Sequence, residues 1–492
     1  MSVLSKNQIK FGTSGFRGII NKTFTNQELI SICNALSIYL KKRSNKPTIA
    51  IAYDPRQGNC PELKANSFTS TVVNTLTSKG ISVHFFTDFT PTPFLAWYVP
   101  KYNLDGGLVL TASHNPPEYN GIKFNPASGA PAEESITSEI EKNLNSSLCQ
   151  FKQYQAKLSM IKPDFNLFSQ DLKNNLLHLG LDCTIDPKLS VSIDSKHGTA
   201  FKTWEALVNT FQLSSVFYLQ KEPLEHFNGI ETNPCNTEEL TLLKDTIHQH
   251  NTSLGIANDP DADRHIILDE NAQALSPEET ALIILDFFLA QKINCCAIIS
   301  TLASSMRLNE ATKKHKFLYH ETMVGFKYIA KYLEEYKTKK QLVFGVESSG
   351  GFSASFHTLE KCGFLPGILI LLAISYFKKP LSELKKDINK RYGNFYFKET
   401  ALRFQEKHTQ NLKKFFLEVN IQVLQPHFSN KISQITNNDG LKIIFQTKQW
   451  ALLRFSGTEP LIRIYVESSQ QKASDKLQEE TLTFIKNTLK AL

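Results

Sequence analysis

The chain has 492 residues, of which 41% are hydrophobic and 21% charged, and its formal net charge is +8. This length exceeds one compact core and predicts three or four domains. The composition is globular and argues against a disordered chain or a membrane protein. Lysines and arginines are spread along the sequence, which argues against nucleic-acid binding but leaves small anionic substrates compatible with the charge.

No segment predicts export or membrane insertion. The longest apolar run, residues 367–375, is too short to span a bilayer and predicts a buried helix. The N-terminal sequence MSVLSKNQIK has neither a long apolar core nor a small-residue cleavage site, so we expect no secretory signal. The eight cysteines form no CxxC pair, which argues against a zinc site and favours reduced thiols in a cytoplasmic protein.

Strands and helices are predicted to alternate from the N-terminus onward. The glycine-rich segment FGTSGFRG, residues 11–18, comes first. The predicted elements that follow are a helix over 26–42, a strand over 48–53, a helix over 61–79, a strand over 81–86, a helix starting at the Pro-rich turn 90–93 and a strand over 106–112. This alternation predicts a parallel, doubly wound sheet.

The same order of strand, polar loop and helix recurs along the next 250 residues. Strands are predicted over 189–193, 253–257, 297–300 and 341–344, and helices over 277–291 and 325–336. The last hundred residues instead show short β-like runs at 395–399, 441–446, 449–455 and 461–466, with helices near 406–418 and 472–490. We therefore predict three similar doubly wound α/β domains and a C-terminal α+β domain, whose boundary lies near 378–380 or 390–393.

A polar, turn-rich loop, TASHNPPEYNGIKF at residues 111–124, follows the apolar run 107–110. The apolar run predicts a buried strand, and ligands of open α/β sheets bind where such strands end. Ser113 would therefore hold its hydroxyl where a substrate arrives. In the alternative interpretation the segment is an ordinary strand-to-helix turn, with Ser113 as the helix cap.

Three carboxylates alternate in the segment DPDADR, at Asp259, Asp261 and Asp263. Such a density of like charge favours a bound cation, and hard oxygen ligands suit Mg²⁺. A calcium EF-hand loop is one alternative, because Glu270 falls at its twelfth position. However, its sixth position, which requires glycine, is Arg264, and the flanks predict strands. A solvated acidic turn is the other alternative.

Two further loops offer groups for a sugar phosphate. FGVESSGG, residues 344–351, follows an apolar strand and supplies a carboxylate and two hydroxyls that can bond vicinal sugar hydroxyls. RFSGTEP, residues 454–460, lies between two strand-like runs, with Arg463 nearby. Its Ser-Gly-Thr turn and arginines suit phosphate oxygens. The segment is not a P-loop, because the Gly-Lys-Ser/Thr ending is missing.

In this order, TASHNPPEYNGIKF, DPDADR, GVESSGG and RFSGTEPLIR resemble the four signature loops of the α-D-phosphohexomutases, and FGTSGFRG resembles their N-terminal segment. The resemblance runs from about residue 10 to residue 467. It implies four domains around a central cleft. We assign residues 1–150 to an α/β domain with the phosphoserine loop, 151–270 to one ending in the metal loop, 271–378 to one with the sugar loop, and 379–492 to an α+β phosphate-binding domain.

Site roles follow from the resemblance, position by position. Ser113 matches the serine that carries the phosphoryl group, and Asp259, Asp261 and Asp263 match the Mg²⁺ ligands, completed by the Ser113 phosphate. Glu347 and Ser349 match the sugar contacts, while Arg454, Ser456, Gly457, Thr458 and Arg463 match the distal phosphate site. Arg17, Lys123, Arg264 and Lys327 fall in loops expected to line the cleft. His114 and Lys327 are candidates for proton transfer; a loop-structuring histidine and a plain charge contact remain the alternatives.

The implied enzyme is a phosphoglucomutase or phosphomannomutase that uses Mg²⁺, with glucose 1,6-bisphosphate as activator. Its partners would be small hexose phosphates, with no nucleic acid or membrane, and the protein would be a monomer or homodimer. Ser348, Phe455 and the segment 360–363 depart from the usual motifs and bear on the choice of sugar. Phosphoglucosamine mutase and a non-catalytic sugar-phosphate-binding protein remain alternatives. A serine hydrolase is disfavoured, because Thr111 and Asn115 replace the glycines of G-x-S-x-G.

Overall fold

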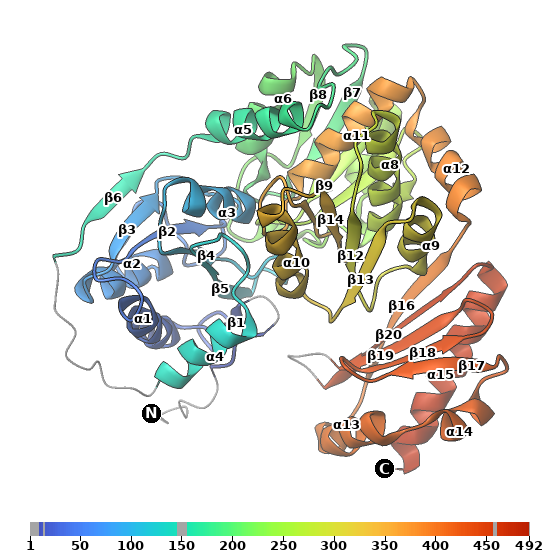
Figure 1. Ribbon diagram of the computed structural model, residues 1–492. Helices are drawn as coiled ribbons and strands as arrows, with labels where there is room; N and C mark the ends of the chain where they lie inside the picture. The colour runs from blue at the N-terminus through green and yellow to red at the C-terminus, as the bar shows by residue number, and fades with distance from the viewer. Residues whose placement is uncertain (1–8, 13–14, 145–154, 456–459, 492) are drawn as a thin grey trace. The chain divides into compact units, whose positions relative to one another are not determined.

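The computed structural model describes residues 9–12, 15–144, 155–455 and 460–491 (Figure 1). The chain divides into two compact units. The first comprises residues 1–297 and 326–385, and the second comprises 298–325 and 386–492. Mixed sheets flanked by helices confirm the predicted α/β class.

The N-terminal sheet of the first unit has six strands in the order β1-β5-β4-β2-β3-β6. Their bounds are β1 Phe16–Ile19, β2 Thr48–Tyr53, β3 Ser82–Phe86, β4 Gly106–Leu110, β5 Tyr119–Pro126 and β6 Leu158–Ile161. The four strands from β4 to β6 are parallel, as predicted, but β5 and β1 run antiparallel. Residues 111–118 between β4 and β5 are too few for a parallel crossover, which takes about a dozen residues.

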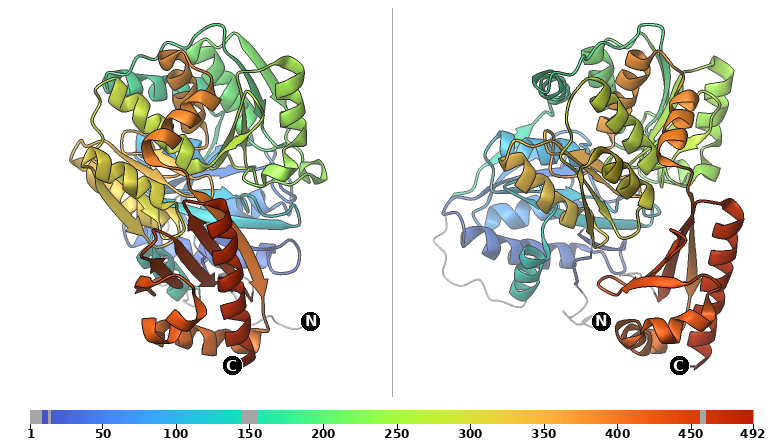
Figure 2. Two further views of the ribbon diagram at one scale, coloured as in Figure 1. Left: turned by 90° about the vertical axis from the view of Figure 1, so that its right-hand side faces the viewer. Right: turned by 45° about the vertical axis from the view of Figure 1, so that its right-hand side comes forward.

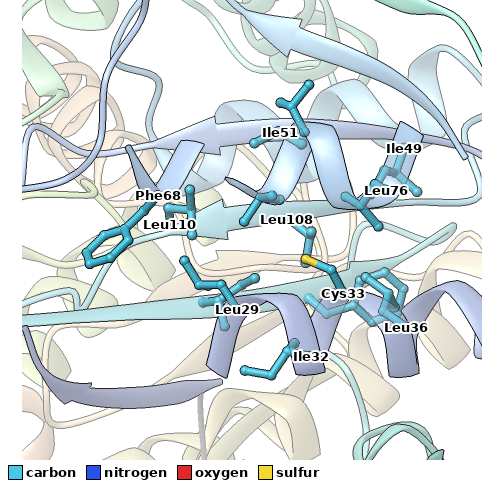
Figure 3. Close-up of a cluster of buried hydrophobic side chains, with 14 of the residues drawn as sticks. Leu29, Ile32, Cys33, Leu36, Ile49, Ile51, Phe68, Leu76, Leu108 and Leu110 are labelled. Atoms are coloured by element: carbon cyan, nitrogen blue, oxygen red, sulfur yellow. The ribbon is translucent and has the colours of Figure 1, made fainter. Parts of the chain in front are cut away.

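Helices cover both faces of this sheet. Helices α1 (Asn26–Lys41) and α2 (Phe68–Ser78) pack on one face, and their apolar side chains meet those of β2 and β4 in the cluster of Figure 3. A capping box of Thr25 and Glu28 starts α1. Helix α3 (Thr92–Lys101) covers the other face so closely that a Cβ on Gly107 would lie 2.7 Å from a Leu95 methyl carbon.

The second sheet has the order β11-β10-β9-β7-β8. The strands are β7 Ser190–Asp194, β8 Ser215–Leu219, β9 Leu254–Asn258, β10 His265–Asp269 and β11 Ala274–Leu275, and the helices are α5 Phe165–His178, α6 Ala200–Phe211 and α7 Thr241–His250. Strands β8, β7 and β9 are parallel, whereas β9 and β10 form an antiparallel pair joined by residues 259–264. The acidic loop is therefore the connection between two adjacent antiparallel strands.

The rest of the first unit supplies the β14–β15 hairpin and its helices. The bounds are α8 Pro277–Ala290, α10 Phe326–Thr338, β14 Val343–Val346, β15 Phe352–Ala354 and α11 Phe364–Phe377. Helix α12, Leu381–Tyr392, begins in the first unit and ends in the second. Helix α11, which contains the predicted apolar helix, is buried over most of its length and lies beside α8 (Figure 1). No single helix of the described residues is long and apolar enough to cross a membrane, although α11 and α12, bent by 88°, pass that test as a pair.

The second unit is built on an antiparallel sheet of order β16-β20-β19-β18-β17. The strands are β16 Tyr396–Arg403, β17 Ile432–Thr436, β18 Leu441–Phe445, β19 Trp450–Phe455 and β20 Leu461–Ser468, and α13 Thr409–Glu418, α14 Ile421–Leu424 and α15 Gln471–Ala491 accompany them. Helix α15 runs along one face of this sheet (Figure 2). The predicted C-terminal α+β architecture is thus confirmed.

The other face of this sheet is covered by a segment distant in sequence. Within residues 298–325, the structure places most of β12 (Ala297–Thr301), α9 (Met306–His315) and β13 (Leu318–Thr322). Leu302 and Ala303 pack on Trp450 and Leu452, and the Met306 amide donates to a Glu467 carboxylate oxygen at 2.9 Å. The sequence did not predict that this segment would join the C-terminal unit.

Among the other differences between predicted and observed elements, two have a clear local cause. The helix expected over 61–79 begins only at Phe68, because the Ser67 hydroxyl accepts from the Ser70 amide and caps it there. Asn120-Gly121, expected within a loop, lies inside β5 instead. Gly121 is needed in that strand because a Cβ would lie 2.6 Å from the Thr111 carbonyl oxygen.

Candidate functional site

Ser113 lies in the short connection from β4 to β5, in a left-handed backbone conformation with φ of 53°. Its side chain is buried, and its Oγ donates a hydrogen bond to Asp259 Oδ2 at 2.8 Å. The element after Ser113 is a strand, so the interpretation of this serine as a helix cap is wrong. A non-glycine residue held at positive φ is unfavourable and marks functional sites when its surroundings enforce it.

The three aspartates of the β9–β10 connection converge. Asp259, Asp261 and Asp263 are each 0% exposed, and one oxygen of each lies within 4.8 Å of the others. Burial excludes a solvated acidic turn. The EF-hand alternative is also wrong, because strands flank the loop and the Glu270 carboxylate accepts from the Ser382 amide at 3.2 Å.

Cations from distant segments surround this acidic cluster. Lys123 Nζ lies 2.5 Å from Asp261 Oδ2 and 2.8 Å from Asp263 Oδ2, and Lys361 Nζ lies 3.2 Å from Asp263 Oδ2. Burial opposes the charge on Lys123, but Asp261 and Asp263 outweigh it and raise the lysine's pKa. Likewise, burial would raise the pKa of Asp263, yet Lys123, Lys361 and Arg264 hold it well below its ordinary value.

The pKa of Asp259 is shifted in the opposite direction from that of Asp263. Burial, together with the charges of Asp261 and Asp263, raises the pKa of Asp259 to about 8. Two oxygens, Asp261 Oδ1 and Asp263 Oδ1, are buried and have no hydrogen-bond partner among the described residues. Unpaired buried acceptors are costly, and a hard cation bound by oxygen would satisfy them. The residues present therefore fit a divalent metal.

The loop from β14 to β15 carries Glu347 and Ser349 and abuts the acidic loop. His265 donates its backbone N–H to the Gly350 carbonyl at 3.0 Å, and Arg264 Nη1 donates to the Ser349 carbonyl at 3.4 Å. Glu347 is buried. The structure thus brings the predicted sugar loop next to Arg264.

Arg17 and His114 join the same region. Arg17 Nη1 donates to Asn115 Oδ1 at 2.6 Å, and burial followed by the charge of Arg264 lowers the pKa of Arg17 to about 10. The His114 Nδ1 lies 3.4 Å from Ser113 Oγ. Burial, then Arg264 and Arg17, hold the pKa of His114 well below its usual range, so this imidazole is neutral at pH 7.

Lys327 lies in the first turn of α10 with its side chain buried. Its Nζ is 5.1 Å from the centroid of the Tyr328 ring. Among the described residues, the interactions seen for Lys327 do not include one with Ser113 or with the aspartates. The structure therefore does not bring this lysine to the acidic cluster by direct contact.

The predicted phosphate residues belong to the second unit. Arg454 and Arg463 face each other as register partners on β19 and β20. Asp439 accepts from Arg454 Nε at 2.9 Å, and Glu399 accepts from Arg463 Nη1 at 2.8 Å. Two like charges on adjacent strands are thus each compensated by a carboxylate. Ser456, Gly457 and Thr458 lie outside the described residues.

Several residues that contact this site were not identified from the sequence. They are Asp54 and Arg56 after β2, Thr92 at the start of α3, Thr232, and Lys361. Thr92 Oγ1 donates to Asp261 Oδ2 at 2.6 Å, and Thr232 Oγ1 donates to the His114 carbonyl at 2.7 Å. Asp54, Arg56 and Thr92 could have been found from their position in the sequence. The segments Asp54-Pro-Arg56 and Thr90-Pro-Thr-Pro93 both follow predicted strands, and ligand-binding groups gather at the ends of such strands.

Four family models match consecutive parts of the chain. They describe phosphoglucomutase/phosphomannomutase α/β/α domain I over residues 8–149, domain II over 167–273, domain III over 276–392 and the C-terminal domain over 399–483. Together they account for most of the sequence, in the order expected for a complete set of four.

Relatives extend over nearly the full length. A phosphoglucomutase/phosphomannomutase of Thermococcus kodakarensis is 27% identical over 95% of this chain and 96% of its own. A probable phosphoglucosamine mutase of Methanobrevibacter smithii is 29% identical over 97% and 99%, respectively. The crystal structure of a putative phosphomannomutase from Thermus thermophilus shares the fold, with a TM-score of 0.80 and 23% identity over 97% of this chain and 99% of that one. The chain belongs to the α-D-phosphohexomutase family, whose members are enzymes that transfer phosphate within a sugar phosphate.

Proposed function

We propose that this enzyme interconverts hexose 1-phosphate and hexose 6-phosphate through a phosphoserine at Ser113 and a hexose 1,6-bisphosphate intermediate. The hydrogen bond of 2.8 Å from Ser113 Oγ to Asp259, at the edge of three buried carboxylates, carries the proposal. A serine hydroxyl beside a buried site for a hard cation suits phosphoryl transfer, which depends on positioning and charge neutralisation. The sequence motifs support four functional domains with the ranges given above.

The reaction consists of two phosphoryl transfers. A hydroxyl oxygen of the sugar monophosphate attacks the phosphorus on Ser113, the bond from phosphorus to Oγ breaks, and the hydroxyl proton leaves to a base while Oγ regains a proton. The resulting bisphosphate turns over, and its other phosphoryl group returns to Ser113. His114 is a candidate for the base, because its Nδ1 lies 3.4 Å from Ser113 Oγ. Lys327 is the other candidate from the motif resemblance, whereas Lys123, whose pKa Asp261 and Asp263 raise, would act as a cation in the catalytic site.

Asp259, Asp261 and Asp263, together with the Ser113 phosphate, would hold Mg²⁺, which supplies charge stabilisation to the phosphoryl oxygens. The chain's own cations add to this environment. Lys123, Lys361 and Arg264 lie at or near the same carboxylates, so the phosphorylated serine would enter a field of positive charge. Glucose 1,6-bisphosphate would act as activator by phosphorylating any Ser113 that has lost its phosphate.

The phosphate that is not transferred would bind at Arg454 and Arg463, with Ser456, Gly457 and Thr458 between them in sequence. Two guanidinium groups on neighbouring strands suit a phosphate dianion, which accepts paired hydrogen bonds. Glu347 and Ser349 would bind the sugar hydroxyls. One sugar clamp and one phosphate cradle allow the bisphosphate to bind in either orientation.

Glucose is the proposed preferred sugar, with mannose second. The loops 115–121 and 345–351 resemble those of the phosphoglucomutase and phosphomannomutase branches. Phosphoglucosamine mutase is the second candidate, because the Methanobrevibacter smithii relative bears that name. We expect the highest kcat/KM with glucose 1-phosphate in a coupled assay of the three hexose 1-phosphates. A higher kcat/KM with glucosamine 1-phosphate would reverse the order.

Replacing the phosphoryl carrier tests the proposed chemistry. We expect Ser113→Ala to lower kcat by at least about a thousandfold, equivalent to about 4 kcal/mol of transition-state stabilisation. Steady-state kinetics with glucose 1-phosphate and glucose 1,6-bisphosphate measure this. Ser128→Ala, in the turn after β5, is the control and should leave kcat unchanged. Near-normal turnover of Ser113→Ala would falsify the phosphoserine mechanism.

Removal of one carboxylate tests the metal site. Loss of a residue that only hydrogen-bonds to a metal ligand lowers metal affinity by roughly 10- to 100-fold. Asp261→Asn changes a proposed ligand itself, so it should lower Mg²⁺ affinity by more than this, and activity should fall with it. Calcium should inhibit, since its looser coordination misplaces the phosphate. Mg²⁺ titrations by calorimetry and by activity check both points. An enzyme indifferent to EDTA and to this substitution would show that the metal assignment is wrong.

Arg454→Ala should lower kcat/KM by about 10- to 100-fold, the value of one or two charge-assisted hydrogen bonds. Part of the loss should appear in kcat, because remote binding energy orients the reacting hydroxyl. Arg454→Lys should recover only part of it, since an ammonium lacks the planar fork. Mg²⁺ affinity should stay unchanged in both. Normal substrate kinetics, or a defect confined to metal binding, would contradict the cradle.

A further inference from the structure

We propose that Arg56 is the positioning residue that sets the Ser113 hydroxyl for phosphoryl transfer, acting with Asp54 and Thr111. The inference rests on the proposed role of Ser113. Arg56 is fully buried at the end of β2 and, among its described contacts, touches neither the three aspartates nor Ser113 Oγ. Its influence on the reaction would pass through the backbone of the loop that carries the serine.

All five N–H groups of the Arg56 guanidinium are used, four of them by this loop and the first residue of β5. Nη2 donates to the carbonyls of Ser113 at 2.5 Å and Asn115 at 2.6 Å, and Nη1 donates to those of Pro116 at 2.7 Å and Tyr119 at 2.8 Å. Nε donates to Asp54 Oδ2 at 3.1 Å. A guanidinium has five N–H donors in a fixed plane, whereas a lysine has three. Lysine at position 56 would therefore leave at least two of these five acceptors without this partner, at least one of them a carbonyl.

The same network also holds the amide of Ser113. The Ser113 N–H donates to Thr111 Oγ1 at 2.8 Å, and Thr111 Oγ1 donates to Asp54 Oδ2 at 2.6 Å. Because Arg56 Nε bonds the same Asp54 oxygen, the chain of contacts closes on itself. It runs from the Ser113 amide through Thr111, Asp54 and Arg56 back to the Ser113 carbonyl. Both peptide groups that flank the serine Cα are thus fixed.

Such a closed circuit matters because Ser113 has a φ of 53°. The left-handed conformation is unfavourable for a residue with a Cβ and persists only when its surroundings enforce it. Rotation of this residue toward ordinary φ would swing Oγ away from Asp259, with which it now forms a hydrogen bond of 2.8 Å. Phosphoryl transfer loses rate steeply when a reacting atom is misplaced by an ångström.

A second segment fixes the outer side of the loop. The Arg56 guanidinium carbon lies 4.8 Å from the centroid of the buried Phe227 ring, and Thr232 Oγ1 donates to the His114 carbonyl at 2.7 Å. Residues 227–232 therefore hold the guanidinium and the residue after Ser113 together. Neither contact reaches the Ser113 peptide groups, so the circuit through Thr111 and Asp54 is the specific constraint on the serine.

Thr111→Val tests the circuit at one bond and changes little volume. Thr111→Ser restores the hydroxyl and serves as the rescue. Thr69→Val is the matched control, because Thr69 Oγ1 is equally buried in the same domain and both accepts from and donates to the Cys60 backbone, away from Ser113. Arg56→Lys is the second variant. Each full-length protein is dephosphorylated, mixed with glucose 1,6-bisphosphate and Mg²⁺, quenched, and assayed for phosphate on Ser113 by intact-protein and peptide mass.

Thr111→Val and Arg56→Lys should lower the rate of Ser113 phosphorylation, and kcat with it, by about 10- to 100-fold, with KM and Mg²⁺ affinity within about twofold of wild type. Thr111→Ser should recover most of the rate. Thr69→Val should lower the urea midpoint as much as Thr111→Val does, yet keep the wild-type rate. Equal rates for folded Thr111→Val, folded Arg56→Lys and wild type would overturn the inference. Absence of phosphate from Ser113 in the wild-type enzyme would instead overturn the proposed function.

Discussion

The mutual repulsion of three buried carboxylates is the constraint on which the rest of the candidate site depends. Asp259, Asp261 and Asp263 are fully buried within 4.8 Å of one another, an arrangement that is strongly unfavourable unless cations compensate it. Lys123 comes to them from β5, and Lys361 from the segment after β15. The attraction of these charges holds two distant parts of the first unit against the acidic loop.

The same charges explain how the site can accept its proposed ligands. A phosphoserine brings about two negative charges, which one divalent cation balances, so the loaded site would keep the net charge that the lysines and Arg264 already compensate. The backbone beside this site is strained. Ser113 has a φ of 53° and Ala262 a φ of 54°, so each of the two connections that meet at the Ser113–Asp259 hydrogen bond holds a non-glycine residue in the left-handed region.

Local sequence patterns predicted much of the fold, because apolar runs and caps act over a few residues. Strand β2 was predicted at its observed bounds, and α1 and α8 within one residue. Strand β5 was not predicted, since Asn-Gly is a typical turn signal and the need for Gly121 comes from the close approach of the Thr111 and Phe16 carbonyls. The association of residues 298–325 with the C-terminal sheet was missed because it depends on contacts between segments more than 100 residues apart.

Some residues of the candidate site could likewise be predicted from the sequence, and others could not. Ser113 and Asp259 are 146 residues apart, and only the motif resemblance predicted that they would meet. Arg56 stood in a predicted strand-end loop, but its four carbonyl acceptors lie 57 to 63 residues further along and their geometry leaves no pattern in the sequence. Lys361 lies in the segment 360–363, which departs from the family motif, so the resemblance assigned it no role. Buried polar networks of this kind need the tertiary structure to be seen.

A single-turnover transfer from the phosphorylated enzyme tests the central claim most directly. Enzyme carrying one phosphate on Ser113 is mixed with a stoichiometric amount of glucose 6-phosphate and Mg²⁺, and both protein and sugar are analysed after quenching. The account predicts that the phosphate leaves Ser113 and that an equal amount of phosphate appears in glucose 1,6-bisphosphate and glucose 1-phosphate. Phosphate that stays on the protein, or that appears as inorganic phosphate without a sugar bisphosphate, would contradict it.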